Sequence, residues 1–348
     1  MRDTPLFLDH AATTPVLPEA RAALSEGLEH WANPSSPHKA GRAARALLEE
    51  ARARVRAALA WDGEVVFTSG ASEALAIAIG RAKARPVVVS AVEHDAVLRP
   101  AGDAMRLAVD GDGIADWGVP PPGALVCVQQ VNSETGVIQP VAEIADGVRA
   151  AGGVLLSDAA QGAGKLALPP ADLIAISAHK FGGPIGIGAL LVRDFALLEA
   201  PGGQERGYRA GTENMPGALA MAAALEAGSD WLVKARRLRE MLEEQVIALG
   251  GEVIASGAAR SPTIGGYRMP GVSSAAQLIR FDGEGIAVSA GSACSSGSLR
   301  PSHVLSAMGL SPKDASEVIR VSIGRETREA DIARFVATWR AIAEGARR

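Results

Sequence analysis

This chain of 348 residues has few cysteines, no excess of positive charge and no long apolar segment. Its 2 cysteines are too few for a disulfide framework. The net charge of −4 gives no sign of a nucleic-acid-binding face. No stretch reaches the roughly 18 to 20 apolar residues of a membrane helix, and the N-terminus lacks the basic start and apolar run of a signal peptide. We therefore expect a cytoplasmic protein that binds neither nucleic acid nor membrane.

Short apolar, β-branched runs alternate with Ala-rich helical stretches over most of the chain. The runs predict strands at residues 64–69, 86–92, 124–131, 154–158, 173–178 and 188–193. Helices are predicted at residues 72–81, 141–151 and 214–249, the last broken near Gly228. The strands are apolar almost throughout, which is typical of a mostly parallel sheet covered on both faces. The fold class is therefore α/β, with ligands at the carboxyl ends of the strands.

The pattern changes after about residue 250, where short strands and helices of a smaller α+β domain follow. This domain is expected to end in a helix over residues 328–345 and to receive the first 15 or so residues of the chain. The predicted division is a large domain, 16–250, and a small domain made of 1–15 and 251–348.

Three features lie at predicted strand ends. In TSGASEALAIAIG (68–80) a strand runs into a turn that opens a helix, and Ser72 adds a hydroxyl to its free N–H groups. Asp158 ends the apolar strand VLLSD, and Lys180 lies in the glycine-rich segment SAHKFGGPIGIGAL (177–190). Taken singly, Ser72 and Asp158 can be helix N-caps and Lys180 an ordinary loop lysine.

One cofactor, pyridoxal phosphate, accounts for all three features. A lysine binds it covalently, a strand-end Asp holds the pyridine nitrogen protonated, and a helix N-terminus binds the phosphate. Ser177 and His179 flank the lysine and can add hydrogen bonds to the phosphate. His94, just after another strand, can stack on the ring and move protons near neutral pH. The glycines after Lys180 are expected to let a flat cofactor lie close to the backbone.

Two further residues suggest what reacts there. Cys294 lies in the Gly-, Ala- and Ser-rich segment VSAGSACSSGSLRPSHVL, where a mobile thiol near an electrophile indicates a nucleophile. Cys127, by contrast, is predicted to be a buried strand residue. Arg320, within the strand VIRVSIGR, can capture a substrate carboxylate or form a salt bridge between domains; its position does not decide which.

Taken together, these motifs resemble the cysteine desulfurases of fold type I, in the NifS/IscS-like branch of the class V aminotransferase superfamily. The resemblance runs nearly end to end. It rests on LDHAATTPV, NPSSPHKAG, FTSGASE, the EH of AVEHDAV, NSETGVIQPV, DAAQGAGK, SAHKFGGPIGIGAL, GGQERGYRAGT, VSAGSACSSGSLRPSHVL and IRVSIGR. It implies a large domain with a mostly parallel seven-stranded sheet, and a small α+β C-terminal domain that carries the catalytic cysteine loop.

For the cofactor, the resemblance implies that Lys180 is the Schiff-base lysine and that Asp158 pairs with the pyridine nitrogen. Gln161 approaches the ring hydroxyl and His94 stacks on the ring. The implied phosphate-binding residues are Ala71, Ser72, Ser177 and His179. The family usually reads Asn-Asn-Glu where this chain has NSE (132–134), so Ser133, shorter but still able to hydrogen-bond, stands at the position that contacts the ring hydroxyl.

For the substrate, the resemblance implies that Asn33 and Arg320 hold the carboxylate of L-cysteine. Thr212, in RAGT, would reach the phosphate bound by a neighbouring subunit, which implies a homodimer. Cys294 would take the sulfur as a persulfide and release L-alanine. The sulfur would then pass to an acceptor protein, for iron–sulfur cluster assembly or tRNA thiolation. No metal site is expected.

Two alternatives stay open at this point. The first is another reaction on the same scaffold, such as that of a selenocysteine lyase, an aminotransferase or a β-lyase; transamination has no use for the loop cysteine. The second is a degenerate paralogue that acts as a binding scaffold. The presence of Lys180, Asp158, His94 and Cys294 argues against the scaffold.

Overall fold

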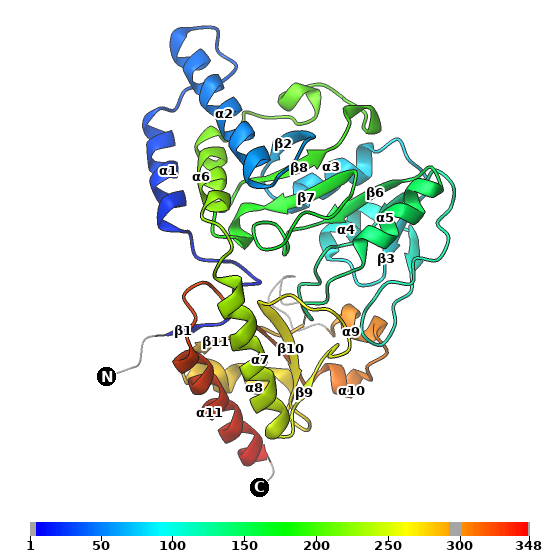
Figure 1. Ribbon diagram of the computed structural model, residues 1–348, viewed down its shortest axis with the longest axis vertical. Helices are drawn as coiled ribbons and strands as arrows, with labels where there is room; N and C mark the ends of the chain where they lie inside the picture. Colours follow the sequence, from blue (N-terminus) through cyan, green and yellow to red (C-terminus); the bar gives the residue numbers. More distant parts are fainter. Residues whose placement is uncertain (1–4, 292–300, 347–348) are drawn as a thin grey trace.

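A seven-stranded sheet forms the centre of the larger part of the molecule, drawn uppermost in Figure 1. The computed structural model describes residues 5–291 and 301–346. The strand order is β2-β8-β7-β6-β5-β3-β4, and β8 is antiparallel to both neighbours while the other pairs are parallel. The predicted mostly parallel sheet of seven strands is thus confirmed. The strands are β2 (Glu64–Thr68), β3 (Val87–Ser90), β4 (Met105–Leu107), β5 (Leu125–Cys127), β6 (Val154–Asp158), β7 (Leu173–Ser177) and β8 (Gly188–Val192).

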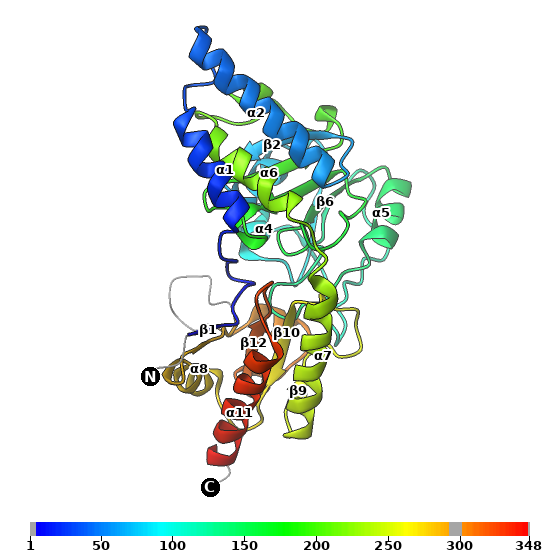
Figure 2. The same cartoon turned by 60° about the vertical axis from the view of Figure 1, so that its left-hand side comes forward.

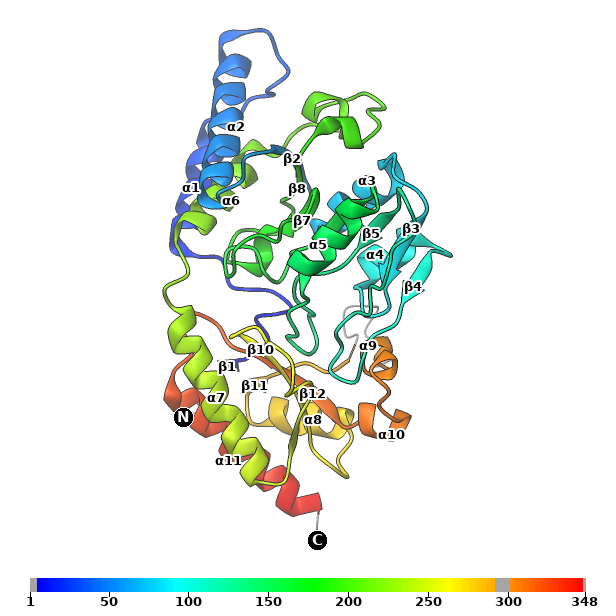
Figure 3. The same cartoon turned by 45° about the vertical axis from the view of Figure 1, so that its right-hand side comes forward.

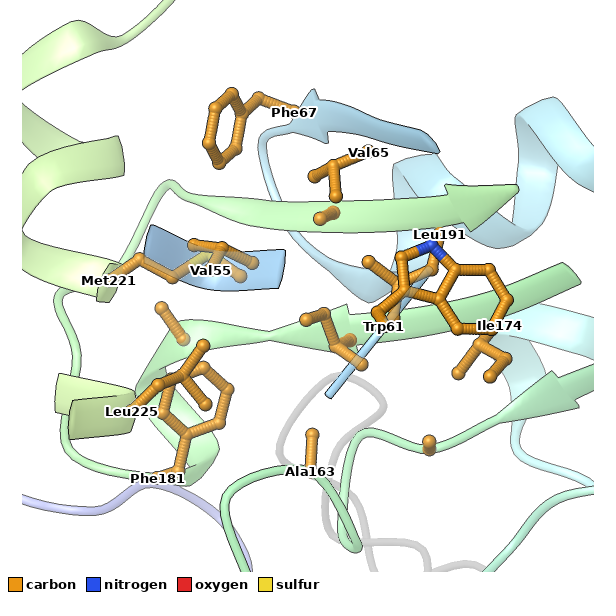
Figure 4. Packing of buried hydrophobic residues seen from close by; sticks show 14 of the residues in the cluster. Val55, Trp61, Val65, Phe67, Ala163, Ile174, Phe181, Leu191, Met221 and Leu225 are labelled. Carbon is orange, nitrogen blue, oxygen red and sulfur yellow. The ribbon is translucent and has the colours of Figure 1, made fainter. Parts of the chain in front are cut away.

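Helices cover both faces of this sheet, which explains its continuous apolar strands. Alternate residues of one strand enter different cores: Val126 packs with one helical layer and Leu125 with the other. One layer consists of α1 (Pro18–Glu29), α2 (Lys39–Ala58), α5 (Val141–Ala150) and α6 (Met215–Glu226). The opposite layer consists of α3 (Ala71–Arg81) and α4 (Asp95–Ala101). Figure 4 shows Val65, Ile174 and Leu191 of the first core packed among side chains of neighbouring segments.

Helix α6 has no polar face, because every residue from Met215 to Leu225 is buried. It lies between the sheet and the pair α1 and α2 (Figure 2). The approach to α1 is close: a Cβ added to Gly27 would lie 2.8 Å from the Cα of Pro216. Within residues 5–291 and 301–346, no helix combines the length and the apolar character needed to cross a bilayer.

The smaller part contains two short sheets and five helices of the described chain. An antiparallel sheet has the order β12-β10-β9, and β1 pairs in parallel with β11. The strands of the smaller part are β1 (Leu6–Phe7), β9 (Glu252–Val253), β10 (Ile264–Arg268), β11 (Ile286–Ala287) and β12 (Val318–Ser322). Its helices are α7 (Leu232–Ala248), α8 (Ser274–Gly283), α9 (His303–Ala307), α10 (Pro312–Ala315) and α11 (Glu329–Ala346). In its core, the rings of Phe281 and Phe335 stack with centroids 4.7 Å apart.

Helix α7 packs in this smaller part, alongside α11 (Figure 3). Its Leu238, Leu242 and Val246 belong to the same core as Phe335 and Trp339. The predicted boundary at residue 250 assigns α7 to the large domain, yet its apolar face contributes to the small one. We therefore propose to place the boundary between α6 and α7.

Candidate active site

A cavity of about 490 Å³ opens at the carboxyl ends of β6 and β7, beside the first turn of α3. Parallel strands bring residues distant in sequence together at this edge. Ten of the predicted site residues line the cavity: Ala71, Ser72, His94, Ser133, Asp158, Gln161, Ser177, His179, Lys180 and Arg320. Two sequence features expected to meet at one place, the turn before α3 and the segment around Lys180, therefore do meet.

Lys180 ends a 3-10 turn, η1 (Ala178–Lys180), that follows β7 directly. Its Nζ donates hydrogen bonds to the carbonyl oxygens of Ala11, at 2.7 Å, and Ala12, at 2.9 Å. Its own carbonyl accepts from Thr14 Oγ1 at 3.1 Å. Residues 11–14, which lead from the small domain into the large one, thus contact both the side-chain nitrogen and the backbone carbonyl of Lys180.

The glycines around Lys180 are required by contacts within the protein. A Cβ at Gly188 would lie 2.6 Å from the Cα of Gly70, and one at Gly183 would lie 2.7 Å from the Cβ of Ala178. Of the glycines in this segment, Gly186 lines the cavity. From the sequence, these glycines were expected to make room for a cofactor close to the backbone. At positions 183 and 188 the atoms in close contact belong to the protein itself.

Asp158 stands at the end of β6, and its Oδ1 accepts the N–H of Ala160 at 2.9 Å. Burial raises the pKa of this carboxyl group, while the Ala160 N–H, His94 and Lys180 oppose that rise. No cation of the described chain forms an ion pair with Asp158. Nearby, Gln161 donates to the carbonyl of Ala11 at 2.8 Å, and its buried Oε1 has no partner. Both groups are thus able to accept a hydrogen bond from a bound molecule.

The first turn of α3 supplies backbone donors. Its N-cap residue is Gly70, so no side chain caps the helix. A Cβ built on Gly70 would lie 3.5 Å from Ser177 Oγ, which places that hydroxyl beside the turn. Uncapped N–H groups with adjacent hydroxyls are suited to a phosphate. His179 lies at the same cavity; burial, Lys180 and Lys165 lower its pKa to about 4.

His94 caps α4 as well as lining the cavity. Its Nδ1 accepts the N–H of Ala96 at 3.0 Å, which fixes the orientation of the ring. In the neutral ring, the proton therefore lies on Nε2. His94 thus caps the start of α4 and lines the cavity from the same position.

Arg320 joins the two domains at the edge of the cavity. One of its nitrogens donates to the carbonyl of Ser133 at 2.9 Å, and another pairs with Asp9 at 2.7 Å. Its buried Nε has no partner. Asp9 belongs to the same small domain as Arg320, so this ion pair is not the interdomain salt bridge that the sequence left open; the contact with the large domain is the hydrogen bond to Ser133, and the guanidinium also faces the cavity.

The match to the family model of class-V aminotransferases spans residues 6–335. This chain belongs to that family. A cysteine desulfurase of Cereibacter sphaeroides is 39% identical over 95% of this chain and 94% of its own. The structure of a NifS-like protein from Rickettsia africae superposes with a TM-score of 0.87 at 27% identity, covering 98% of this chain and all of the other. A structure described as SspA in complex with cysteine matches with a TM-score of 0.79 at 28% identity, over 92% and 99% of the two chains. The resemblance inferred from the motifs is confirmed.

Class-V aminotransferases generally depend on pyridoxal phosphate, and the residues of this cavity fit that group. A cationic ring nitrogen suits the unpaired Asp158, and a phosphate suits the uncapped first turn of α3. The orphaned Oε1 of Gln161 can accept from the ring hydroxyl. Lys180 is within the same lining, as a covalent link requires.

A second cavity, of about 360 Å³, lies beyond His94 in this class-V aminotransferase fold. Ser302 donates to Glu134 at 2.6 Å at its wall, and His303 Nε2 lies 2.8 Å from the carbonyl oxygen of Glu93. Its lining also includes Gly291, the last residue described before the segment 292–300. Cys294 falls in that segment and so lies outside the described residues.

Two predicted residues are not among those that line either cavity. Asn33 lies in the connection between α1 and α2, where its Oδ1 accepts the N–H of Ser35 at 2.9 Å. Thr212 is exposed, in the loop before α6. The role predicted for Thr212 requires a second subunit.

Two residues of the site, Asn132 and Glu93, stand in motifs that carry the family resemblance, but the sequence assigned them no role. Asn132 is buried, and its Oδ1 accepts the N–H groups of Glu134 and Thr135, each at 2.9 Å, which shapes the turn that holds Ser133. Glu93 is fully buried, and burial raises its pKa well above the ordinary value. The position of Glu93, directly before His94 at a strand end, is a signal that could have indicated its place.

Proposed function

We propose that this chain is a pyridoxal-phosphate-dependent cysteine desulfurase. The observation that carries the proposal is that Lys180, Asp158 and the first turn of α3 line one cavity in a class-V aminotransferase 39% identical to a named cysteine desulfurase. The reaction converts L-cysteine and one thiol of the enzyme into L-alanine and an enzyme persulfide. We expect it to take place in the cytoplasm.

The cofactor is held by residues at the carboxyl edge of the sheet. Lys180 binds it covalently and Asp158 keeps its ring nitrogen protonated, while His94 stacks on the ring. Gln161 and Ser133 approach the ring hydroxyl. The phosphate lies at the first turn of α3, with four residues around it: Ala71, Ser72, Ser177 and His179. When bound, pyridoxal phosphate withdraws electrons from the carbon atoms of the amino acid.

The substrate carboxylate binds at Arg320. The guanidinium already holds Asp9 through one nitrogen, and its buried Nε has no partner, so one donor remains for a second carboxylate. Asn33 is the second carboxylate ligand that the family resemblance implies. His94 moves a proton, since its Nδ1 is occupied by Ala96 and its Nε2 carries the exchangeable proton.

Cys294 takes the sulfur. As a thiolate it attacks the sulfur of the bound cysteine, so that an S–S bond forms and the Cβ–S bond breaks. The electron pair of the broken bond stays with Cβ, which takes up a proton and leaves as the methyl group of alanine. The persulfide then passes to an acceptor protein of iron–sulfur cluster assembly or tRNA thiolation. A homodimer completes each site, with Thr212 of one subunit at the phosphate of the other.

The proposal is tested by measuring alanine production from L-cysteine with cofactor-loaded protein under reducing conditions. Cys294→Ala is expected to abolish alanine production and to keep the colour of the bound cofactor. The matched control is Cys127→Ala, since Cys127 is buried in β5, as predicted, and is expected to leave turnover nearly unchanged. Full turnover by Cys294→Ala, or a wild-type protein that takes up no cofactor, would overturn the proposal.

A further inference from the structure

A small cavity of about 20 Å³ adjoins Lys180, which, like Ala11, lines both this cavity and the larger one. Three cationic side chains and one imidazole line it: Lys165, Lys180, Arg325 and His10. Among the described residues of this lining, none is Asp or Glu. Cations gathered without a carboxylate repel one another, and they do so most strongly where water is scarce.

The local chain structure fixes Lys165 in this position. It ends a tight turn after β6, in which its N–H donates to the carbonyl of Gly162 at 2.9 Å. Gly164, at φ +71°, packs on the residue after Lys180, because a Cβ there would lie 3.0 Å from the Cβ of Phe181. The turns that carry Lys165 and Lys180 are therefore in contact.

The side chain of Lys165 has no hydrogen bond or ion pair with any residue in 5–291 or 301–346. Arg325, another cation of this lining, does have partners. Its guanidinium donates to the carbonyls of Ala227 and Gly228 and lies over the ring of Trp231. Lys165 is half-buried, and a half-buried ammonium without a partner is uncommon, because proteins usually pair such groups. Burial, followed by the charge of Lys180, lowers the pKa of Lys165 to about 7.

The pKa values of the two neighbouring imidazoles, His10 and His179, are lowered as well. Burial and the charge of Lys165 lower the pKa of His10 to about 4, and its buried Nδ1 has no partner. His179 is neutral in the same pH range. The one carboxylate that opposes these cations, Asp158, lies on the cofactor side of Lys180. Of Lys165, His10 and His179, Lys165 is therefore the one whose charge changes near neutral pH.

We propose that the charge of Lys165, acting across the small cavity, sets the pH at which the nitrogen of Lys180, once linked to the cofactor, gains a proton. Lys165 is thus a positioning residue that acts through Lys180. This rests on the proposed function, in which Lys180 carries pyridoxal phosphate. A charged Lys165 disfavours a second positive charge at that nitrogen and so keeps it unprotonated at lower pH. The two groups titrate as a coupled pair. An unprotonated nitrogen can accept the proton of the incoming amino acid's ammonium group.

The test is a pH titration of the visible absorbance of cofactor-loaded protein. Lys165→Met removes the charge, and we expect the midpoint of the colour change to rise by about 1–3 pH units, the effect of one charge roughly 4–12 Å away at an effective dielectric of about 20. Lys165→Arg keeps its charge at all pH values, and its midpoint is expected at or below that of the wild type. Lys39→Met is the matched control, since Lys39 is exposed at the start of α2, and it should titrate like the wild type.

An unchanged midpoint in Lys165→Met that still binds the cofactor would overturn the inference. If Lys165→Met does not fold or loses the cofactor, Lys165→Arg decides: a midpoint above that of the wild type contradicts the inference. Failure of the proposed function is distinct, because wild-type protein would then take up no cofactor and show no colour to titrate.

Discussion

The buried pair of Arg52 and Glu205 offers a quantitative test of what holds α2 on β2. Arg52 in α2 donates to Glu205 at 2.7 and 3.0 Å, and the two residues are 5% and 3% exposed. Glu205 also accepts the N–H of Phe67 at 2.9 Å, just before the turn that leads into α3. The pair therefore joins α2, β2 and the loop around Glu205.

Removing Arg52 leaves the charge of Glu205 buried and unpaired, which typically costs about 3–5 kcal/mol, whereas removing Glu205 leaves Arg52 paired with Glu49 at 3.0 Å. A second pair on the same helix is a matched control. Arg54 and Glu226 are also joined by two hydrogen bonds, at 2.8 and 2.7 Å, but their side chains are 32% and 42% exposed. Exposed pairs of this kind contribute only about 0–1 kcal/mol. The two pairs differ mainly in burial.

The assay is urea denaturation of the cofactor-loaded protein in two double-mutant cycles. One cycle combines Arg52→Met with Glu205→Gln, and the other combines Arg54→Met with Glu226→Gln. We expect a coupling free energy of about 2 kcal/mol or more for the buried pair, and below about 1 kcal/mol for the exposed pair. Equal coupling energies in the two cycles would refute the reasoning that burial decides the effect.

Three further predictions concern the site. Glu93→Gln is expected to raise the melting temperature at pH 7–8 but not near pH 4. In the unfolded chain the carboxyl group of Glu93 loses its proton near pH 4.5, whereas in the folded protein it does so only at higher pH. The wild-type protein therefore loses stability as the pH rises, and the variant does not. An equal gain at both pH values would contradict this. Asp158→Asn should weaken cofactor binding by roughly 10- to 150-fold in equilibrium dialysis, the loss of one charge-assisted bond; unchanged affinity would contradict the assigned role. Ser302→Ala, which loses the bond to Glu134 and the cap of α9, should cost about 1–2 kcal/mol in thermal unfolding, and exposed Ser306→Ala clearly less.

The sequence predicted the strands that are apolar over their whole length, because burial on both faces leaves an unmistakable pattern. It did not predict β4, whose three residues lie at the edge of the sheet, with Met105 55% exposed. Edge strands pair on one side only and need no continuous apolar run. For α7, the apolar spacing indicated a helix that packs, but the pattern contains no information on which core receives it.

The same distinction applies to the site. Its members could be predicted where a residue type at a strand end has a chemical reason, as for Asp158 and Lys180. The partner of Arg320 could not, since Asp9 is 311 residues away and only the folded chain brings them together. Lys165 went unnoticed as a candidate because its significance depends on the absence of a carboxylate around it, which no local pattern records.

The hydrogen bonds from Lys180 to Ala11 and Ala12 also set an order of events during synthesis. The N-terminal segment reaches its position only when Leu6 pairs with Ile286 and the N–H of Ala11 bonds to Ser322 Oγ. The segment around Ala11 must therefore wait for β12, the last strand of the described residues, before it can dock. The seven-stranded sheet can assemble earlier, but the hydrogen bonds from Lys180 to Ala11 and Ala12 form only after β12 has been synthesised. A nascent chain is thus expected to present an unfinished candidate site until β12 has left the ribosome.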